Sequence, residues 1–159
     1  MEGNGELIMP IKSFRGLIED GGQTTIPLST RNGSQGYKIK YFDVFPKNPG
    51  HTADKELVVT IWSIKQTSHP AGPGTEIDFS DQTLLGVGYF TENSSGSVVT
   101  NDAVIIFENM VFNQDIYIVN QDQSTGEAAN YYLELESVKL DLNENTVATL
   151  KDIRNIVGQ

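Results

Sequence analysis

The chain has 159 residues and no cysteine, which suits a single domain with its own core and excludes disulfides, thiolate metal sites and iron–sulfur clusters. Its two histidines, His51 and His69, are too few for a multi-histidine zinc centre. The formal net charge of −10 argues against direct binding of nucleic acid, which needs a positive surface.

The charge is unevenly divided along the chain. Residues 1–65 hold 8 basic and 7 acidic side chains, whereas residues 66–159 hold 3 basic and 14 acidic ones. We interpret the acidic part mainly as a solvated surface that favours solubility. The start of the chain lacks the basic and apolar segments of a secretory signal, and no run reaches the roughly 18–20 apolar residues of a membrane helix. We therefore expect a protein made in the cytoplasm, with no membrane partner.

The composition predicts a β protein. Val, Ile and Thr together number 39, against 17 for Ala and Leu, and β-branched side chains fit pleated sheets better than helices. In chain order, we expect an arm over residues 1–10, in which Pro10 interrupts the apolar run Leu7–Ile11. A strand is expected next over Phe14–Ile18, followed by a short edge strand over Thr24–Leu28 that carries Pro27.

The middle of the chain predicts the best-defined strands. In the strand around residues 37–44, Tyr37, Ile39 and Tyr41 share one parity and Phe42 and Val44 the other, which predicts a β-bulge or a bend. The run 56–65 is apolar on both parities and therefore predicts a central strand covered on both sides. It contains the lone tryptophan, Trp62, which we interpret as a core residue rather than a platform for sugar stacking.

Four more strands are expected, over residues 83–91, 103–107, 115–120 and 130–140. Gly86 and Gly88 in the first of these allow close approach of another backbone or a bend. The C-terminal segment 146–157 predicts a short helix, capped by Asn143 or Asn145, with an apolar stripe that needs a docking surface. The stripe consists of Val147, Leu150, Ile153 and Val157.

Together these elements predict an all-β fold: a two-sheet antiparallel β-sandwich of about eight strands, jelly-roll in topology, with a short C-terminal α-helix. The expected organisation is a single domain, with an arm at 1–10, the sandwich at 11–142 and the helix at 143–159, packed on the sandwich or on a neighbour. The residues expected to contact partners are Leu7, Ile8, Ile11, Val147, Leu150, Ile153 and Val157. The arm could add a strand to the sheet edge of a neighbour.

Motifs for catalysis are weak or missing in the sequence. There is no Gly-x-Ser-x-Gly elbow and no phosphate-binding Gly-x-x-x-x-Gly-Lys-Ser/Thr motif. Both histidines occur in loop-like stretches. Two carboxylate groups could serve a glycosidase, but the first has the sequence of a turn and the second that of a solvated sheet face. They are Glu76/Asp78/Asp81 and Glu134/Glu136. We expect no enzymatic activity and no cofactor.

One calcium-binding pattern is present in outline. Asp141, Asn143, Asn145 and Asp152 have the spacing of the start and end of an EF-hand loop, but Thr146 stands where that loop needs glycine. The same residues also explain a helix cap, so we expect no metal site and keep these four as weak candidates only.

Four stretches of the sequence are distinctive: IKSFRGLIEDGGQTTIPL from Ile11, ENMVFNQDIYI from Glu108, NYYLELE from Asn130 and, most specifically, KLDLNENTVATLKDIRN from Lys139. In these stretches the sequence resembles small, largely uncharacterised virion proteins of marine tailed bacteriophages. The resemblance spans most of residues 11–155. It implies a structural protein of the virion that is assembled in the host cytoplasm, and it brings no catalytic residues.

This resemblance and the β pattern lead us to expect a capsid decoration or cement protein. Such a protein would bridge major capsid subunits on the outer shell, as a homo-oligomer or in many copies per particle. A tail or neck protein is one alternative. A carbohydrate-binding module is another, for which six tyrosines supply possible contacts. These are Tyr37, Tyr41, Tyr89, Tyr117, Tyr131 and Tyr132.

Overall fold

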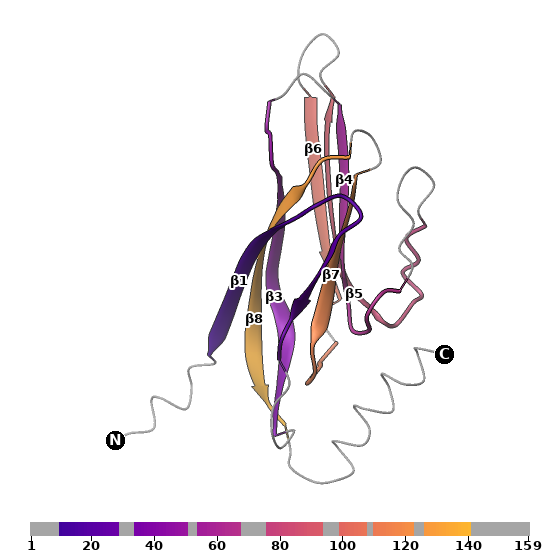
Figure 1. Ribbon diagram of the computed structural model, residues 1–159. Coiled ribbons are helices and arrows are strands. Elements are labelled where there is room, and N and C mark those ends of the chain that lie inside the picture. Colours follow the sequence, from indigo (N-terminus) through magenta and orange to yellow (C-terminus); the bar gives the residue numbers. More distant parts are fainter. Residues whose placement is uncertain are drawn as a thin grey trace.

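The computed structural model describes residues 10–28, 34–50, 54–67, 76–93, 99–107, 110–122 and 126–140, which form eight strands in two antiparallel β-sheets (Figure 1). The strands are β1 (Ile11–Ile18), β2 (Gln23–Ile26), β3 (Gln35–Pro46), β4 (Lys55–Trp62), β5 (Leu84–Asn93), β6 (Val99–Ile106), β7 (Ile116–Asp122) and β8 (Ala129–Lys139). The prediction of an all-β fold with about eight strands in two antiparallel sheets is confirmed.

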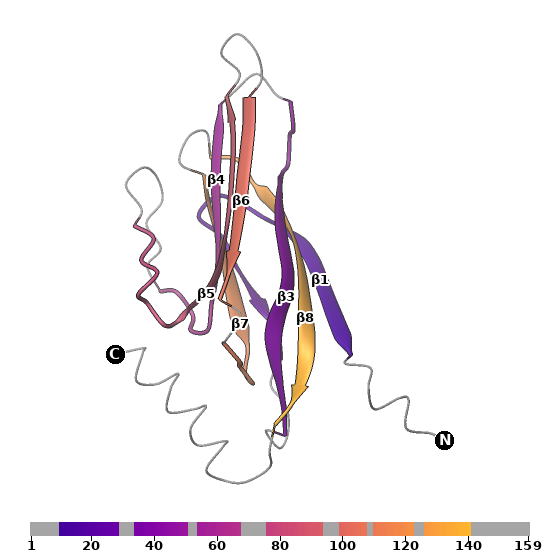
Figure 2. The same ribbon diagram turned by 180° about the vertical axis from the view of Figure 1, so that it is seen from behind.

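The first sheet has the strand order β1-β8-β3, and the second has the order β2-β7-β4-β5-β6. Figures 1 and 2 show the two sheets face to face, with β3 of the first sheet opposite β5 and β6 of the second. The run 56–65 was predicted as a central strand, and β4 indeed lies between β7 and β5. The predicted edge strand carrying Pro27 corresponds to β2, which lies at the edge of the five-stranded sheet and ends just before that proline.

The core lies between the sheets because each strand turns alternate apolar side chains inward. In β4, for example, Leu57, Val59 and Ile61 have no exposed surface. Leu133 and Leu135 of β8 meet them from the other sheet and are also fully buried. A smaller cluster lies on the outer side of the five-stranded sheet, where Val58, Leu84 and Val87 pack with partly buried aromatic side chains that include Trp62. The tryptophan therefore belongs to this satellite cluster and not to the main core.

The predicted break in the side-chain alternation of β3 is present. The pairing of β3 with β8 shifts by one residue between Ile39 and Tyr41, so that Lys40 is the extra residue of a β-bulge. The position expected for Tyr41 was wrong, since the bulge comes before this residue and turns it outward, with 46% of its surface exposed. Tyr37 and Ile39 remain buried, and Phe42 and Val44 continue the buried side beyond the bulge.

Of the two glycines in β5, Gly88 is the one to which the opposite sheet comes closer. A Cβ atom placed there would overlap the Val44 side chain of β3 and would lie 3.0 Å from Cε2 of Phe42. Gly86 has more room, since its nearest atom would be the main-chain oxygen of Ile105 at 3.3 Å. These glycines were predicted to allow close approach of another backbone or a bend, but the atoms that come close to Gly88 belong to the side chains of Val44 and Phe42.

Candidate functional site

The three-stranded sheet has an outer face, turned away from the five-stranded sheet, that carries most of the exposed large apolar side chains. Successive side chains of a strand point to opposite faces, so the residues between the buried ones of β1, β3 and β8 share this outer face. Of the eight exposed large hydrophobic residues in the described part of the chain, five are on it. They are Ile11, Leu17, Tyr41, Phe45 and Tyr132, whereas Ile77, Phe79 and Ile105 lie elsewhere.

The strand register places these side chains in rows across the sheet. Leu17 of β1 and Phe45 of β3 flank Asn130 of β8. The next row, two residues along, contains Arg15, Tyr132 and Asp43. The two rows enclose a groove of about 490 Å³. Its lining consists of Arg15, Gly16, Leu17, Asp43, Val44, Phe45, Asn130, Tyr131 and Tyr132.

Two tyrosine rings on the outer face are in contact, and each hydroxyl donates a hydrogen bond to a neighbouring carboxylate. The rings of Tyr41 and Tyr132 meet edge to face, with their centroids 5.9 Å apart. The Tyr41 hydroxyl donates to Oδ2 of Asp43 (3.1 Å), and the Tyr132 hydroxyl donates to Oε2 of Glu134 (2.7 Å). These hydrogen bonds, together with the negative charges, raise the pKa of both hydroxyls above the ordinary value. Both rings are therefore held as neutral, oriented contact surfaces.

The groove combines aromatic and aliphatic walls with a few polar groups. Phe45 and Tyr132 offer ring surface, and Arg15, Asp43 and Asn130 offer a cation, an anion and an amide. A surface of this kind binds a partner through apolar contact and sets the orientation of that partner through hydrogen bonds. The carboxylate in its lining, that of Asp43, accepts a hydrogen bond from the Tyr41 hydroxyl.

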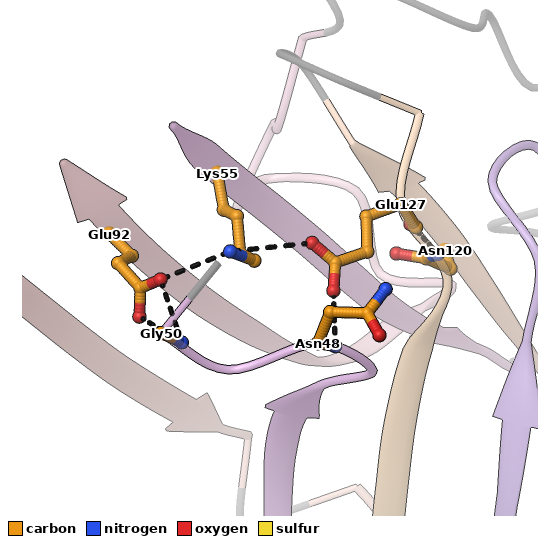
Figure 3. A network of polar contacts seen from close by, with 6 residues as sticks. All are labelled: Asn48, Gly50, Lys55, Glu92, Asn120 and Glu127. Carbon is orange, nitrogen blue, oxygen red and sulfur yellow. Dashed lines mark hydrogen bonds and ion pairs between the residues drawn. The ribbon is translucent and has the colours of Figure 1, made fainter. Parts of the chain in front are cut away.

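A second polar arrangement, a buried ion cluster at one end of the sandwich, has a structural role (Figure 3). Nζ of Lys55 lies 3.0 Å from Oε2 of Glu92 and 3.8 Å from Oε2 of Glu127. Each carboxylate also accepts from the turn that follows β3: Glu92 from the Gly50 N–H (3.1 Å) and Glu127 from the Asn48 N–H (2.6 Å). The cluster therefore ties that turn to β4, to β5 and to the segment before β8.

The environment of Glu92 favours its charged form. Its hydrogen bond with Lys55 lowers the carboxyl pKa below 4.5, and the Gly50 N–H and the positive charge of Lys55 act in the same direction against the effect of burial. Nearby, the fully buried Asn120 donates from Nδ2 to the carbonyl oxygens of Ile18 (3.0 Å) and Glu127 (3.2 Å), which links the two sheets. Within the part of the chain that the structure describes, its Oδ1 has no hydrogen-bond partner.

Of the residues predicted to contact partners, only Ile11 falls within the described part of the chain, where it is 44% exposed at the start of β1. The others lie outside the described residues, and so do the expected C-terminal helix, both histidines and all four weak calcium candidates. These are Leu7, Ile8, Val147, Leu150, Ile153 and Val157, together with His51, His69, Asp141, Asn143, Asn145 and Asp152.

The carboxylate groups considered for hydrolysis have other roles in the structure. Oδ1 of Asp78 accepts from the N–H and the hydroxyl of Ser80, and these bonds lower its pKa. Oδ1 of Asp81 accepts from Thr83 in the same way, so both aspartates shape turns. Glu134 and Glu136 lie on the outer face of the three-stranded sheet, and their interpretation as a sheet-face pair is confirmed.

The six tyrosines are divided by the fold. Tyr37 and Tyr131 are buried, and Tyr89 and Tyr117 are partly buried, so only Tyr41 and Tyr132 remain as exposed ring surfaces. Sequence reasoning missed Leu17 and Phe45 as surface residues. In β1, residues 14, 16 and 18 lie on one face and residues 15 and 17 on the other, so this alternation could have indicated that Leu17 points outward. In β3, Phe42 and Val44 share the inward face, which could have indicated that Phe45, between their positions and the strand end, points outward.

No protein-family model matches this chain, and no curated protein sequence matches it. The described residues contain no helical segment with the length and apolar character needed to cross a bilayer. In the same residues, no three side chains of the metal-binding types lie close enough together to hold an ion.

Proposed function

We propose that this chain is a non-enzymatic structural protein of a virus particle, a decoration or cement protein that binds the outer shell through the outer face of its three-stranded sheet. The observation that carries the proposal is the exposure of Leu17, Phe45 and Tyr132 side by side on that face. A contiguous patch of exposed aromatic and aliphatic side chains is typical of a surface that binds another protein. The resemblance of most of residues 11–155 to small virion proteins supports the setting, and for that setting we propose a major capsid protein as the partner.

The strand pairing supports a jelly roll, the topology expected of such a module. In a jelly roll the first strand pairs with the last, the second with the seventh and the fourth with the fifth. The pairs β1–β8, β2–β7 and β4–β5 follow this pattern. The remaining pair of a jelly roll, the third strand with the sixth, is not formed among the described strands. Instead, β6 pairs with β5 and meets β3 only across the core. We propose a jelly roll in which the sixth strand has stayed in the sheet of the fifth.

The proposal is tested by binding the purified protein to virus particles that lack it. Phe45 is 58% exposed, so burying its ring against a partner contributes about 1–1.5 kcal/mol, and Phe45→Ser is expected to weaken binding roughly tenfold. The control is Ile105→Ser, on the opposite side of the molecule, where the side chain is 42% exposed and no loss is expected. Equal binding by the two variants, or no protein on purified particles, would exclude this face as the docking surface.

The copy number per particle separates the shell from the tail or neck. A shell protein is present in many copies, one or more for each capsid subunit, whereas a neck or tail ring holds only a few. Quantitative mass spectrometry of purified particles measures this ratio directly, and a ratio far below that of the capsid subunit would favour the tail or neck alternative.

Saccharide binding is the second candidate, and the groove specifically favours it. Phe45 and Tyr132 present ring surface, while Arg15, Asp43 and Asn130 could exchange hydrogen bonds with sugar hydroxyls. A glycan array with the wild-type protein and a Tyr132→Ala variant tests this function. Selective binding that the variant loses would support it, and an array without any bound glycan would eliminate it.

A further inference from the structure

Among the described strands, β1 pairs only with β8, so its other edge, which is one edge of the three-stranded sheet, is unpaired. Ser137 N–H donates to the carbonyl oxygen of Pro10 (2.9 Å), and the antiparallel register continues from the pair of Ile11 and Glu136. Because hydrogen-bonded and non-bonded pairs alternate in an antiparallel ladder, the even-numbered residues of β1 bond to β8 and the odd-numbered ones face away from it. In the described part of the chain, the main-chain groups of the odd-numbered residues have no hydrogen-bond partner. These are Ile11, Ser13, Arg15 and Leu17.

The charged side chains of β1 do not block this edge. Lys12 lies over the ring of Tyr37, with Nζ 5.3 Å from the ring centroid, and Tyr37 belongs to β3 on the far side of β8. Its side chain therefore points away from the free edge. Arg15 lines the groove above β8 and thus also lies over the sheet. Natural edge strands are usually protected by prolines, bulges or projecting charges, and the eight-residue β1 has none of these at its open side.

We propose that the free edge of β1 pairs with β1 of a second copy of this chain, antiparallel and about a twofold axis at Phe14. This register alone uses all four edge-facing residues, since Ile11 then faces Leu17 of the second copy and Ser13 faces Arg15. Apolar side chains meet apolar ones on the outer face. No two charges of like sign stand directly opposite each other, because Lys12 faces Gly16 of the second copy.

The same register brings the two Phe14 side chains together on the inner side of the sheet. Phe14 is partly buried and packs against the rim of the main core, so its partner extends that core across the twofold axis. The two three-stranded sheets become one six-stranded sheet in the order β3-β8-β1-β1-β8-β3. Shifting the pairing by two residues would set Arg15 against Arg15 or against Ile11, which explains why a single register is preferred.

The dimer joins two outer faces into one surface. Leu17 at the rim of one groove meets Ile11 of the second copy, so the apolar patch continues across the axis. Both grooves remain open because they lie over β8, one strand away from the new pairing. The pairing does not depend on the proposed role in a virus particle.

Sedimentation velocity of the full chain over a concentration series tests the proposal, with Ser13→Pro as the main variant. The N–H of Ser13 faces the free edge, so proline there leaves the pairing with β8 intact while it removes a donor from each copy and places a ring at the edge. We expect a concentration-dependent dimer whose dissociation constant rises at least about tenfold in Ser13→Pro and is unchanged in Ser13→Ala. A monomer at every concentration, or a dimer that survives Ser13→Pro with an unchanged constant, would overturn the proposal.

Oxidative cross-linking gives a readout that does not depend on how well Ser13→Pro folds. The chain has no cysteine, so a single introduced cysteine can only pair with the same position of another copy. At the twofold axis, position 14 faces itself in a non-hydrogen-bonded pair with Cα atoms about 4.5 Å apart, which suits a disulfide. Position 13 is separated from its own copy by roughly 8–9 Å, which is too far. We expect Phe14→Cys to form a covalent dimer and the more exposed Ser13→Cys not to. Equal cross-linking of the two variants, or none with Phe14→Cys, contradicts the register.

Discussion

Replacing Lys55 by methionine should destabilise the protein strongly, because it leaves two buried carboxylates without their cation. Only 1% of the Lys55 side chain is exposed, and the side chains of Glu92 and Glu127 are 4% and 9% exposed. Removing one partner of a buried ion cluster costs about 3–5 kcal/mol. For a chain of this size, that corresponds to a fall of roughly 6–20 °C in the melting temperature.

The effect should depend on pH in a defined direction. With Lys55 present, the pKa of Glu92 is lowered, so its contribution to the free energy of unfolding is present above pH 4.5 and is lost as the pH falls through the lowered value. Without Lys55, burial raises the pKa of Glu92 and the weaker effect of the Gly50 N–H opposes it only in part, so acid protonates the carboxyl and relieves the penalty. The difference in unfolding free energy between Lys55→Met and the wild type should therefore shrink between pH 7 and about pH 4.

Urea denaturation at several pH values measures both effects. The matched control is Lys38→Met, because Lys38 pairs with Glu136 at 3.9 Å but its side chain is 42% exposed. A solvated pair of this kind contributes at most about 1 kcal/mol, so the control should stay close to the wild type. If Lys55→Met loses no more than Lys38→Met at pH 7, or if its loss is the same at all pH values, the reasoning about the ion cluster is refuted.

Three further changes test the packing of the two sheets. Gly88→Ala should lower the unfolding free energy by about 1–3 kcal/mol in urea titrations, because the new Cβ atom overlaps the Val44 side chain. Gly86→Ala should lower it less, and the opposite ranking of the two variants would contradict the close approach at Gly88. Adding Val44→Ala to Gly88→Ala should recover part of the overlap cost, and a double-mutant cycle without positive coupling would count against it. Asn120→Ala should cost about 1–3 kcal/mol, because the carbonyl oxygens of Ile18 and Glu127 lose their side-chain donor, and amide hydrogen exchange at Gly21 should rise with it.

The fold class could be predicted because the side-chain pattern is local. Period-two alternation and β-branched runs identified the strands, and the run 56–65 identified a central strand from its apolar residues on both parities. The bulge in β3 was located only to within a residue or two. A switch of parity shows that one extra residue exists, but the hydrogen bonds of the partner strand decide which residue it is, and here it is Lys40.

The candidate site could not be predicted from sequence because it depends on register. Leu17, Asn130 and Phe45 come from three strands that are far apart in the chain, and only the pairing of β8 with both β1 and β3 places them in one row. The ion cluster is similar, since Lys55, Glu92 and Glu127 have no common sequence spacing. Long-range strand pairing thus creates both arrangements, whereas composition alone indicated only an acidic surface.

A density map of a virus particle that contains this chain is the sharpest test of the proposed function, because it shows whether the chain is part of a shell and which face of the sandwich meets another protein. We expect a major capsid protein against the outer face of the three-stranded sheet, with the rings of Phe45 and Tyr132 in the interface. A particle in which that face is turned to solvent, while the five-stranded sheet contacts the shell, would contradict it.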